Sequence, residues 1–239
     1  MRLDVRRVEE VSSTNDEAKR LAADGAAEGT VVVAERQTAG RGRRGRVWQS
    51  VPGNLFLSIV LRPKIAPSAA PPLAPAIGLA VALAIEDVAP LSAELKWPND
   101  VRVGGRKVAG ILTESVVSGS ALAAVIAGIG LNVGAELPAE LAEIATTLSR
   151  EAVRNVRKSE VEAALLKRIQ DIYGRFLAGG FASLHAEWQE RDALNGHRVT
   201  IDTGGTRVEG EGAGIAEDGA YRVKVASGEV VRVTAGEVS

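Results

Sequence analysis

Residues 94–133, ELKWPNDVRVGGRKVAGILTESVVSGSALAAVIAGIGLNV, decide the fold because they contain four strand-like runs in close succession. Two-residue turns at Gly104-Gly105 and Ser118-Gly119 separate the longer runs, and such turns join neighbouring antiparallel strands. The expected strands are residues 94–97, 101–103, 107–114 and 121–133. We therefore predict a meander of adjacent antiparallel strands in the middle of the chain.

The segments before this meander alternate strand-like and helix-like patterns. A short strand starts near residue 3, and Thr14 and Glu17 have capping-box spacing for a helix that runs to about residue 23. The further elements expected here are buried strands at residues 30–34 and 54–61 and an apolar helix near residues 73–88. Prolines between residues 63 and 75 fix the backbone, so we predict a loop before that helix.

A long helix and a group of short strands are predicted after the meander. Ser159 and Glu162 have capping-box spacing, apolar residues then recur at three- and four-residue intervals, and Gly179-Gly180 ends the helix. A shorter helix follows, to about residue 191. Alternating strands with glycine turns after residue 196 predict a β-barrel of about 45 residues, too small to bury much core unless it is docked. We expect one domain at residues 1–192 and the barrel at residues 193–239.

The composition excludes several classes of function. The chain carries 29 Lys and Arg against 30 Asp and Glu, so no excess charge favours nucleic acid or an anionic membrane. The absence of cysteine removes disulfides, thiolate nucleophiles and cysteine zinc sites. The two histidines, His185 and His197, have no metal-ligand spacing and give little support to Ser-His-Asp chemistry.

Hydropathy predicts a cytoplasmic protein without a membrane segment. Residues 1–10 are charged and alternating, and they lack the apolar core of a signal peptide. The apolar runs at residues 77–85 and 121–131 are shorter than the ~20 residues that a membrane span needs.

The strongest local signal is the run GRGRRGR at residues 40–46, which combines four arginines with three glycines. It matches G-x-G-x-x-G formally, but a dinucleotide-binding motif opens a helix, and here residues 47–53 lead into a strand. Four arginines this close repel one another unless an anion neutralises them. We predict a loop that is disordered alone and ordered by a ligand bearing phosphate and carboxylate. The alternative is a solvated basic loop or a weak RNA-binding patch.

The second signal is KWPND at residues 96–100, followed by Lys107. Simple strand alternation places Lys107 on the face of Ala109 and Ile111, either at the sheet edge or aimed into a cleft. In a cleft, its ammonium would neutralise charge on a carboxylate that attacks an α-phosphate. Asp100 would hold Mg²⁺ or orient an incoming amine, although Asn-Asp after a proline also suits plain turn chemistry.

The third signal is a strand face without side chains. Gly128 and Gly130 occupy alternate positions of the strand at residues 121–133, and glycine inside a strand marks the close approach of a ligand or another backbone. Asn132 shares that face, and its amide can read a donor and an acceptor on a purine edge. Trp48 would stack on an adenine, although a lone tryptophan more often belongs to the core or its rim.

Several of these motifs, taken in order, resemble the catalytic core of biotin-protein ligases. They are SSTN (12–15), ERQTAGRGRRGRVW (35–48), NLFLSIVLRP (54–63), LKWPNDV (95–101), KVAGILTE (107–114) and GIGLNV (128–133). The resemblance covers most of residues 8–134. A later pattern resembles the family's entry into its C-terminal barrel: Trp188, Asp192, Leu194, Gly196 and Val199. The implied fold is α+β, with a mixed, largely antiparallel sheet flanked by helices, as in class II synthetases, and an SH3-like barrel.

The resemblance also implies a two-step reaction. Biotin and MgATP give biotinyl-5'-AMP and pyrophosphate, and the adenylate then acylates a lysine on the biotin carboxyl carrier domain of a carboxylase. The implied substrates are ATP and biotin, with Mg²⁺ as cofactor. The arginine loop would close over the adenylate and exclude water.

The family's functional positions carry over onto matching residues of this chain. The implied catalytic residues are Lys107, Arg43 and Asp100, with Asp100 as the candidate Mg²⁺ ligand. The implied biotin-binding residues are Ser13, Thr14, Asn15, Gln37, Gly40, Arg41, Gly42, Arg43, Lys107, Gly110 and Gly128. The implied ATP- and adenylate-binding residues are Arg41, Arg43, Arg44, Arg46, Trp48, Asn99, Lys107, Gly130 and Asn132.

Some members of that family begin with a helix-turn-helix domain that represses transcription, whereas this chain starts at the catalytic core. We therefore expect an enzyme with no nucleic-acid partner. The oligomeric state cannot be predicted from the residues, but the resemblance implies a homodimer, which the family often forms. The alternatives are a lipoate- or octanoate-protein ligase of the same fold, and a non-catalytic module that binds biotin or an anion.

Overall fold

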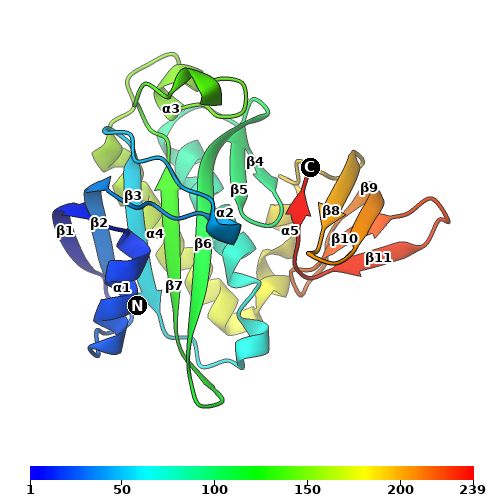
Figure 1. Cartoon of the computed structure of the whole chain (residues 1–239), viewed down its shortest axis with the longest axis horizontal. Coiled ribbons are helices and arrows are strands. Elements are labelled where there is room, and N and C mark those ends of the chain that lie inside the picture. The colour runs from blue at the N-terminus through cyan, green and yellow to red at the C-terminus, as the bar shows by residue number, and fades with distance from the viewer.

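The structure, a computed structural model, describes residues 1–239 and contains two sheets (Figure 1). The large sheet has the order β1-β2-β3-β7-β6-β5-β4, and only its β1–β2 pair is parallel. Its strands are β1 (Asp4–Val11), β2 (Thr30–Gln37), β3 (Leu55–Leu61), β4 (Ala93–Lys96), β5 (Asp100–Val103), β6 (Arg106–Ser118) and β7 (Ala121–Leu131). The predicted meander and the mixed α+β class are confirmed, because β4 to β7 follow one another as antiparallel neighbours.

The second sheet is antiparallel throughout, as expected for an SH3-like barrel, and has the order β11-β10-β9-β8-β12. Its strands are β8 (Arg198–Asp202), β9 (Arg207–Ile215), β10 (Tyr221–Lys224), β11 (Val230–Val233) and β12 (Glu237–Val238). The helices are α1 (Thr14–Ala23), α2 (Leu73–Val88), α3 (Leu148–Glu151), α4 (Lys158–Gly179) and α5 (His185–Gln189). Short 3-10 turns are η1 (Arg43–Gly45), η2 (Pro67–Ala69), η3 (Ala139–Leu141) and η4 (Phe181–Leu184).

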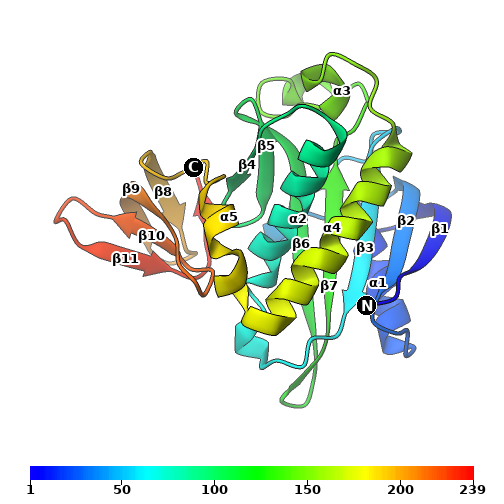
Figure 2. The same ribbon diagram turned by 180° about the vertical axis from the view of Figure 1, so that it is seen from behind.

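The two faces of the large sheet are covered unequally. Helices α2 and α4 lie across one face (Figure 2), where Leu55, Leu57 and Ile59 of β3 join a core of 49 buried residues. Val60 points the opposite way, because strand side chains alternate, into a cluster of only seven buried residues beneath α1. Helix α1 therefore covers only part of its face and leaves the rest of it to loops.

Neither predicted capping box is present. Ser13 is the N-cap of α1, which shifts the helix start by one residue, and the Thr14 side chain bonds instead to Gln37 and Ser58. Helix α4 begins at Lys158 after Arg157, and Glu162 forms an ion pair with Arg7 of β1. Thr14 and Glu162, which the local pattern assigned to helix caps, thus bond to residues that are distant in the sequence.

Helix α2 and the turn before it, residues 67–88, are long and apolar enough by length and composition to cross a membrane. The sequence prediction, which considered only shorter apolar runs, was wrong on that length. Most of the segment is buried inside the protein, and α2 packs against both the large sheet and α4. This placement is that of a core helix in a globular protein.

The second sheet docks on the β4 side of the large sheet. Leu95 of β4 exchanges backbone hydrogen bonds with Arg191 and Ala193, which lead into the second sheet. Trp97 donates its Nε1–H to the Gly219 carbonyl, and its ring lies 5.7 Å from that of Tyr221. The two sheets share one continuous hydrophobic core, which supplies the burial that so small a barrel lacks on its own.

Asp192 lies at this junction and titrates abnormally. Its carboxylate accepts hydrogen bonds from the Leu194 backbone amide and from the Tyr221 hydroxyl, each at 2.9 Å. Burial outweighs these bonds and raises the pKa of Asp192 to about 6. A raised carboxyl pKa means that the native state binds the proton more tightly than the unfolded chain does. The stability that the native state gains by binding this proton more tightly is therefore present at low pH, and it is lost as pH rises through about 6.

We predict that Asp192→Asn becomes progressively more stable relative to the parent as pH rises from about 4 to about 7, by up to roughly 3 kcal/mol, because the parent must then bury an ionised carboxylate. Urea unfolding across this pH range measures the difference. Asp171→Asn, at an exposed position of α4, is the control and should show no such trend. A pH-independent difference for Asp192→Asn would contradict the raised pKa.

Candidate active site

A strip of positions without side chains crosses the sheet face that α1 leaves open. Gly130 of β7 pairs with Gly110 of β6. Two residues further along the strands, on the same face of the sheet, Gly128 pairs with Leu112. On the other side, Gly128 pairs with Ser58 of β3. These residues point away from α2 and α4, so the strip gives surrounding segments direct access to the backbone of the sheet.

A cavity of about 490 Å³ lies over this strip. Its lining includes every predicted site residue except Gly40: Ser13, Thr14, Asn15, Gln37, Arg41, Gly42, Arg43, Arg44, Arg46, Trp48, Asn99, Asp100, Lys107, Gly110, Gly128, Gly130 and Asn132. Gly40 lies just outside, where its carbonyl accepts the Trp48 amide and a Cβ would meet the Trp48 carbonyl at 2.4 Å. Residues chosen from four separate segments of the sequence thus converge on one cavity.

Trp48 lies directly on the glycine strip. A Cβ on Gly130 would come within 2.3 Å of its indole ring, and one on Gly110 within 2.9 Å. The Lys107 ammonium lies 5.4 Å from the ring centroid, within the range of a cation–π interaction. The indole Nε1–H is buried without a hydrogen-bond partner, an arrangement that costs free energy and that an acceptor on a ligand would relieve.

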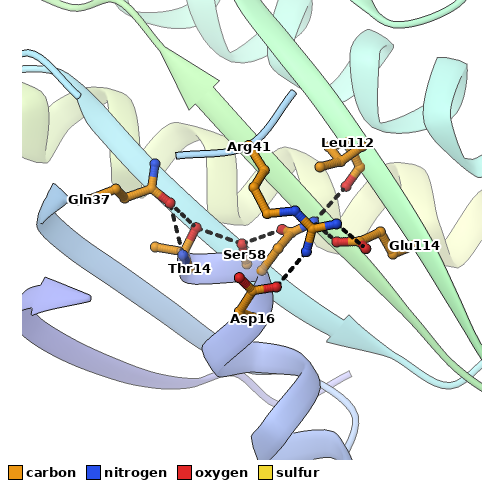
Figure 3. Close-up of polar contacts among 8 residues, drawn as sticks. Thr14, Asp16, Gln37, Arg41, Ser58, Leu112 and Glu114 are labelled. Carbon is orange, nitrogen blue, oxygen red and sulfur yellow. Dashed lines mark hydrogen bonds and ion pairs between the residues drawn. The ribbon is translucent and has the colours of Figure 1, made fainter. Parts of the chain in front are cut away.

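The first turn of α1 supplies a second wall through a network of polar side chains (Figure 3). Gln37 Oε1 accepts hydrogen bonds from the backbone amide and hydroxyl of Thr14, at 2.8 and 3.2 Å. The Ser58 hydroxyl lies 2.8 Å from Thr14 Oγ1 and 2.7 Å from Asn15 Oδ1. A Cβ on Gly128 would meet Asn15 Oδ1 at 2.0 Å, so only glycine lets Asn15 approach the sheet. The network fixes the orientation of each amide before any ligand binds.

The four arginines of the loop have partners within the chain itself. Arg41 bonds to Asp16 and Glu114, Arg43 bonds to Asn99 and the Gly236 carbonyl, and Arg44 and Arg46 both pair with Glu237 of β12. The expected charge repulsion is thus offset by carboxylates that the sequence pattern did not reveal. Burial and the neighbouring Arg44 lower the pKa of Arg43. Ordering of the loop by a ligand stays a prediction.

Lys107 lines the cavity with Gly110, and its ammonium is 2.7 Å from Asp100 Oδ1. The predicted face was wrong, because Ala109 and Ile111 lie in the core on the opposite side of the sheet. The β5–β6 register shifts so that Arg102 faces Lys107 while Val101 faces Ala109. This irregularity inserts one residue and reverses the alternation at Lys107.

The carboxylates of the chain are not gathered into a three-ligand cluster. No group of three His, Cys, Asp or Glu side chains is placed to hold a metal ion. Asp100, the predicted Mg²⁺ ligand, is ion-paired with Lys107, and its role toward Mg²⁺ stays a prediction. A single paired carboxylate can at most supplement the phosphate oxygens that Mg²⁺ brings with a nucleotide.

Sequence reasoning missed several residues of the site, and those that bond to predicted side chains include Asp16, Ser58, Glu114 and Glu237. Ser58 gave a usable signal, as the lone polar residue in the apolar run at residues 55–61. Glu114 closes the quoted motif KVAGILTE but has no distinctive spacing. Asp16 and Glu237 look like ordinary surface carboxylates in the sequence, and only the fold brings them to the arginine loop.

Residues 8–132 match the biotin/lipoate A/B protein ligase family, and the chain belongs to that family. The chain is 36% identical over 222 residues to the bifunctional ligase/repressor BirA of Bacillus subtilis, covering 91% of this chain and 68% of that protein. It is 35% identical over 232 residues to the biotin–[acetyl-CoA-carboxylase] ligase of Paracoccus denitrificans, covering 95% and 96% of the two chains. The biotin protein ligase of Aquifex aeolicus in complex with biotin and ATP is similar in structure, with a TM-score of 0.85, 32% identity, and coverage of 99% and 97%.

We predict that Gly130→Ala displaces Trp48 from the strip, because the new methyl group would overlap the indole. The variant should lose about 1–3 kcal/mol of stability, and acrylamide should quench a larger share of its tryptophan fluorescence. Gly174→Ala in α4 is the control, since its Cβ meets nothing within 4 Å. Unchanged quenching and stability in Gly130→Ala would contradict the packing of Trp48 on this strip.

Proposed function

We propose that this protein is an ATP-dependent biotin-protein ligase. It activates biotin as biotinyl-5'-AMP and transfers the biotinyl group to a lysine of a carrier domain. The observation that supports this most is the convergence, in one cavity, of a prearranged hydrogen-bonding wall, a lysine cation and the arginine loop. The relatives named as biotin ligases, and the similar structure that holds biotin and ATP, support biotin as the acid.

Lys107 is the catalytic cation in this proposal. A biotin carboxylate oxygen attacks the α-phosphorus of ATP, the bond from that phosphorus to the bridging oxygen breaks, and pyrophosphate leaves. The Lys107 ammonium stabilises the negative charge on the attacking carboxylate and the α-phosphate. Asp100 holds Lys107 in position through their 2.7 Å ion pair, and Arg43 contributes a second, partly buried positive charge. In the transfer step a lysine amine attacks the acyl carbon, AMP leaves with the bonding electrons, and the amine loses its proton.

The two walls of the cavity divide the substrates. The proposed biotin side comprises Ser13, Thr14, Asn15, Gln37, Gly40, Arg41, Gly42, Arg43, Lys107, Gly110 and Gly128. The proposed nucleotide side comprises Arg41, Arg43, Arg44, Arg46, Trp48, Asn99, Lys107, Gly130 and Asn132. Gln37 Nε2 has no hydrogen-bond partner, which leaves it free to donate to a polar group of the acid. Magnesium enters as part of the MgATP substrate, and Asp100, the candidate Mg²⁺ ligand, lines the same cavity.

We propose that residues 1–192 form the catalytic domain and that residues 193–239 form the barrel. We also propose that the protein is a cytoplasmic homodimer. The acceptor of the biotinyl group is a biotin carboxyl carrier domain. Strand β6 continues to Ser118, past the residues that bond to the β5 side. Its edge is unpaired there, and such an edge accepts a strand from another chain.

The deciding experiment is incubation of the full chain with ATP, Mg²⁺, biotin and a carrier domain. The expected result is a carrier mass increase equal to one biotinyl group, dependent on ATP. A parallel reaction with lipoate tests the other acid of the family. ATP–pyrophosphate exchange with lipoate but not with biotin would contradict the proposal, and so would biotin binding without any exchange.

We predict that Lys107→Ala lowers the rate of biotin-dependent ATP–pyrophosphate exchange by a factor of about 10²–10³, the usual effect of losing one preorganised charge-stabilising group. Lys167→Ala, which removes an exposed lysine of α4, is the matched control and should exchange at the parental rate. Near-parental exchange in Lys107→Ala would remove Lys107 from the mechanism.

A further inference from the structure

Glu114 lies at the border of the cavity. The proposed reaction gives its carboxylate no role. It lies on β6 beyond Gly110 and Leu112, on the same face of the sheet, and its side chain is only 17% exposed. Across the strand pair it faces Ile126, a member of the small core beneath α1. A carboxylate this enclosed requires donors from its surroundings, because desolvation disfavours its charge.

The two oxygens of Glu114 bind two different parts of the site (Figure 3). Oε2 accepts a hydrogen bond from Asn15 Nδ2 at 2.8 Å, in the first turn of α1. Oε1 accepts one from Arg41 at 3.0 Å, at the start of the arginine loop. One carboxylate therefore links the wall of the cavity to the loop that covers it.

A second carboxylate, that of Asp16, also holds Arg41. Arg41 also donates to Asp16, which directly follows Asn15 in α1, so two carboxylates hold the two terminal nitrogens of one guanidinium. These contacts raise the pKa of Arg41, with the Asp16 hydrogen bond as the largest cause. Both terminal nitrogens of Arg41 are engaged within the chain, so Arg41 attaches the loop to α1 and β6 in addition to lining the cavity.

Backbone contacts within the loop connect Arg41 to Trp48. Arg41 forms an antiparallel bridge with Val47, and the Trp48 amide bonds to the Gly40 carbonyl at 2.9 Å. Residues 40–48 therefore form a small closed hairpin. Its far side is held independently, through Arg44 and Arg46, by Glu237 of the second sheet.

We propose that Glu114 is a positioning residue that couples the acid-binding wall to the arginine loop. It holds Arg41 so that the loop stays closed and the activated acid is retained. This inference rests on the proposed function, since it assigns a role during the lifetime of the adenylate. Loss of Glu114 opens the loop on the α1 side, and water or stray amines then reach the adenylate, while the nucleotide contacts near Glu237 persist.

The test compares the parent with Glu114→Gln and with Glu86→Gln. Glu86 forms an ion pair with Arg191 beside α2, at 27% and 20% exposure, so its variant loses a similar arginine pair away from the cavity. Two quantities are measured on the full chain: the rate at which bound biotinyl-5'-AMP is lost without a carrier, and the rate of tryptic cleavage after Arg43, Arg44 or Arg46 without substrates.

For Glu114→Gln we expect both rates to rise about tenfold, as for loss of one charge-assisted hydrogen bond, with the KM for ATP within about twofold of the parental value. Glu86→Gln should change neither rate. Arg41→Met removes the same pair from the more exposed side, and it should raise the rate of tryptic cleavage in the loop about tenfold even if Glu114→Gln folds poorly. Adding Glu114→Gln to Arg41→Met should then change little, because Glu114 acts through Arg41.

Parental adenylate retention and parental trypsin resistance in Glu114→Gln would overturn the inference. So would effects of Glu114→Gln and Arg41→Met that multiply, since a purely structural contribution of Glu114 to folding would act independently of Arg41. If the parent itself forms no adenylate, the proposed function fails. The tryptic comparison still decides whether Glu114 holds the loop.

Discussion

The site depends on one steric constraint, the absence of side chains at Gly110, Gly128 and Gly130. These positions let Trp48 and Asn15 reach the backbone of the sheet at distances that a Cβ would forbid. The strip can exist because the opposite face of the same strands is packed against α2 and α4 and supplies most of the hydrophobic burial. The sheet is thus stabilised on one side and kept bare on the other, where a ligand needs a flat and rigid wall.

Charge balance is the second constraint. A loop with four arginines would be unstable on the surface of an almost neutral protein without local counter-charges. Asp16, Glu114 and Glu237 supply them from three separate elements, so the loop is held at both of its sides. An incoming triphosphate meets positive groups that are already positioned, and catalysis gains from groups that need no reorganisation.

The sequence predicted the large sheet well because its information there is local. Two-residue turns identified the β4 to β7 meander, and the long apolar run of β3 is typical of a strand buried on both faces. Nearly all of the residues that the motifs identified line the cavity. What failed depended on tertiary structure. The register shift opposite Val101 and Arg102 reversed the face of Lys107, and long-range partners took Thr14 and Glu162 from their expected caps.

The contacts between the arginine loop and β12 also bear on how the protein folds. Arg43 and Gly236, like Arg44 and Glu237, are 193 positions apart in the sequence. Contacts between such distant residues form late, because the chain entropy lost in bringing them together must be offset by structure already present. The arginine loop is therefore completed only after both sheets have formed and docked. In a partly folded chain the arginine loop would lack its contacts with Gly236 and Glu237. Binding of the nucleotide, which uses this loop, is therefore a sensitive measure of complete folding.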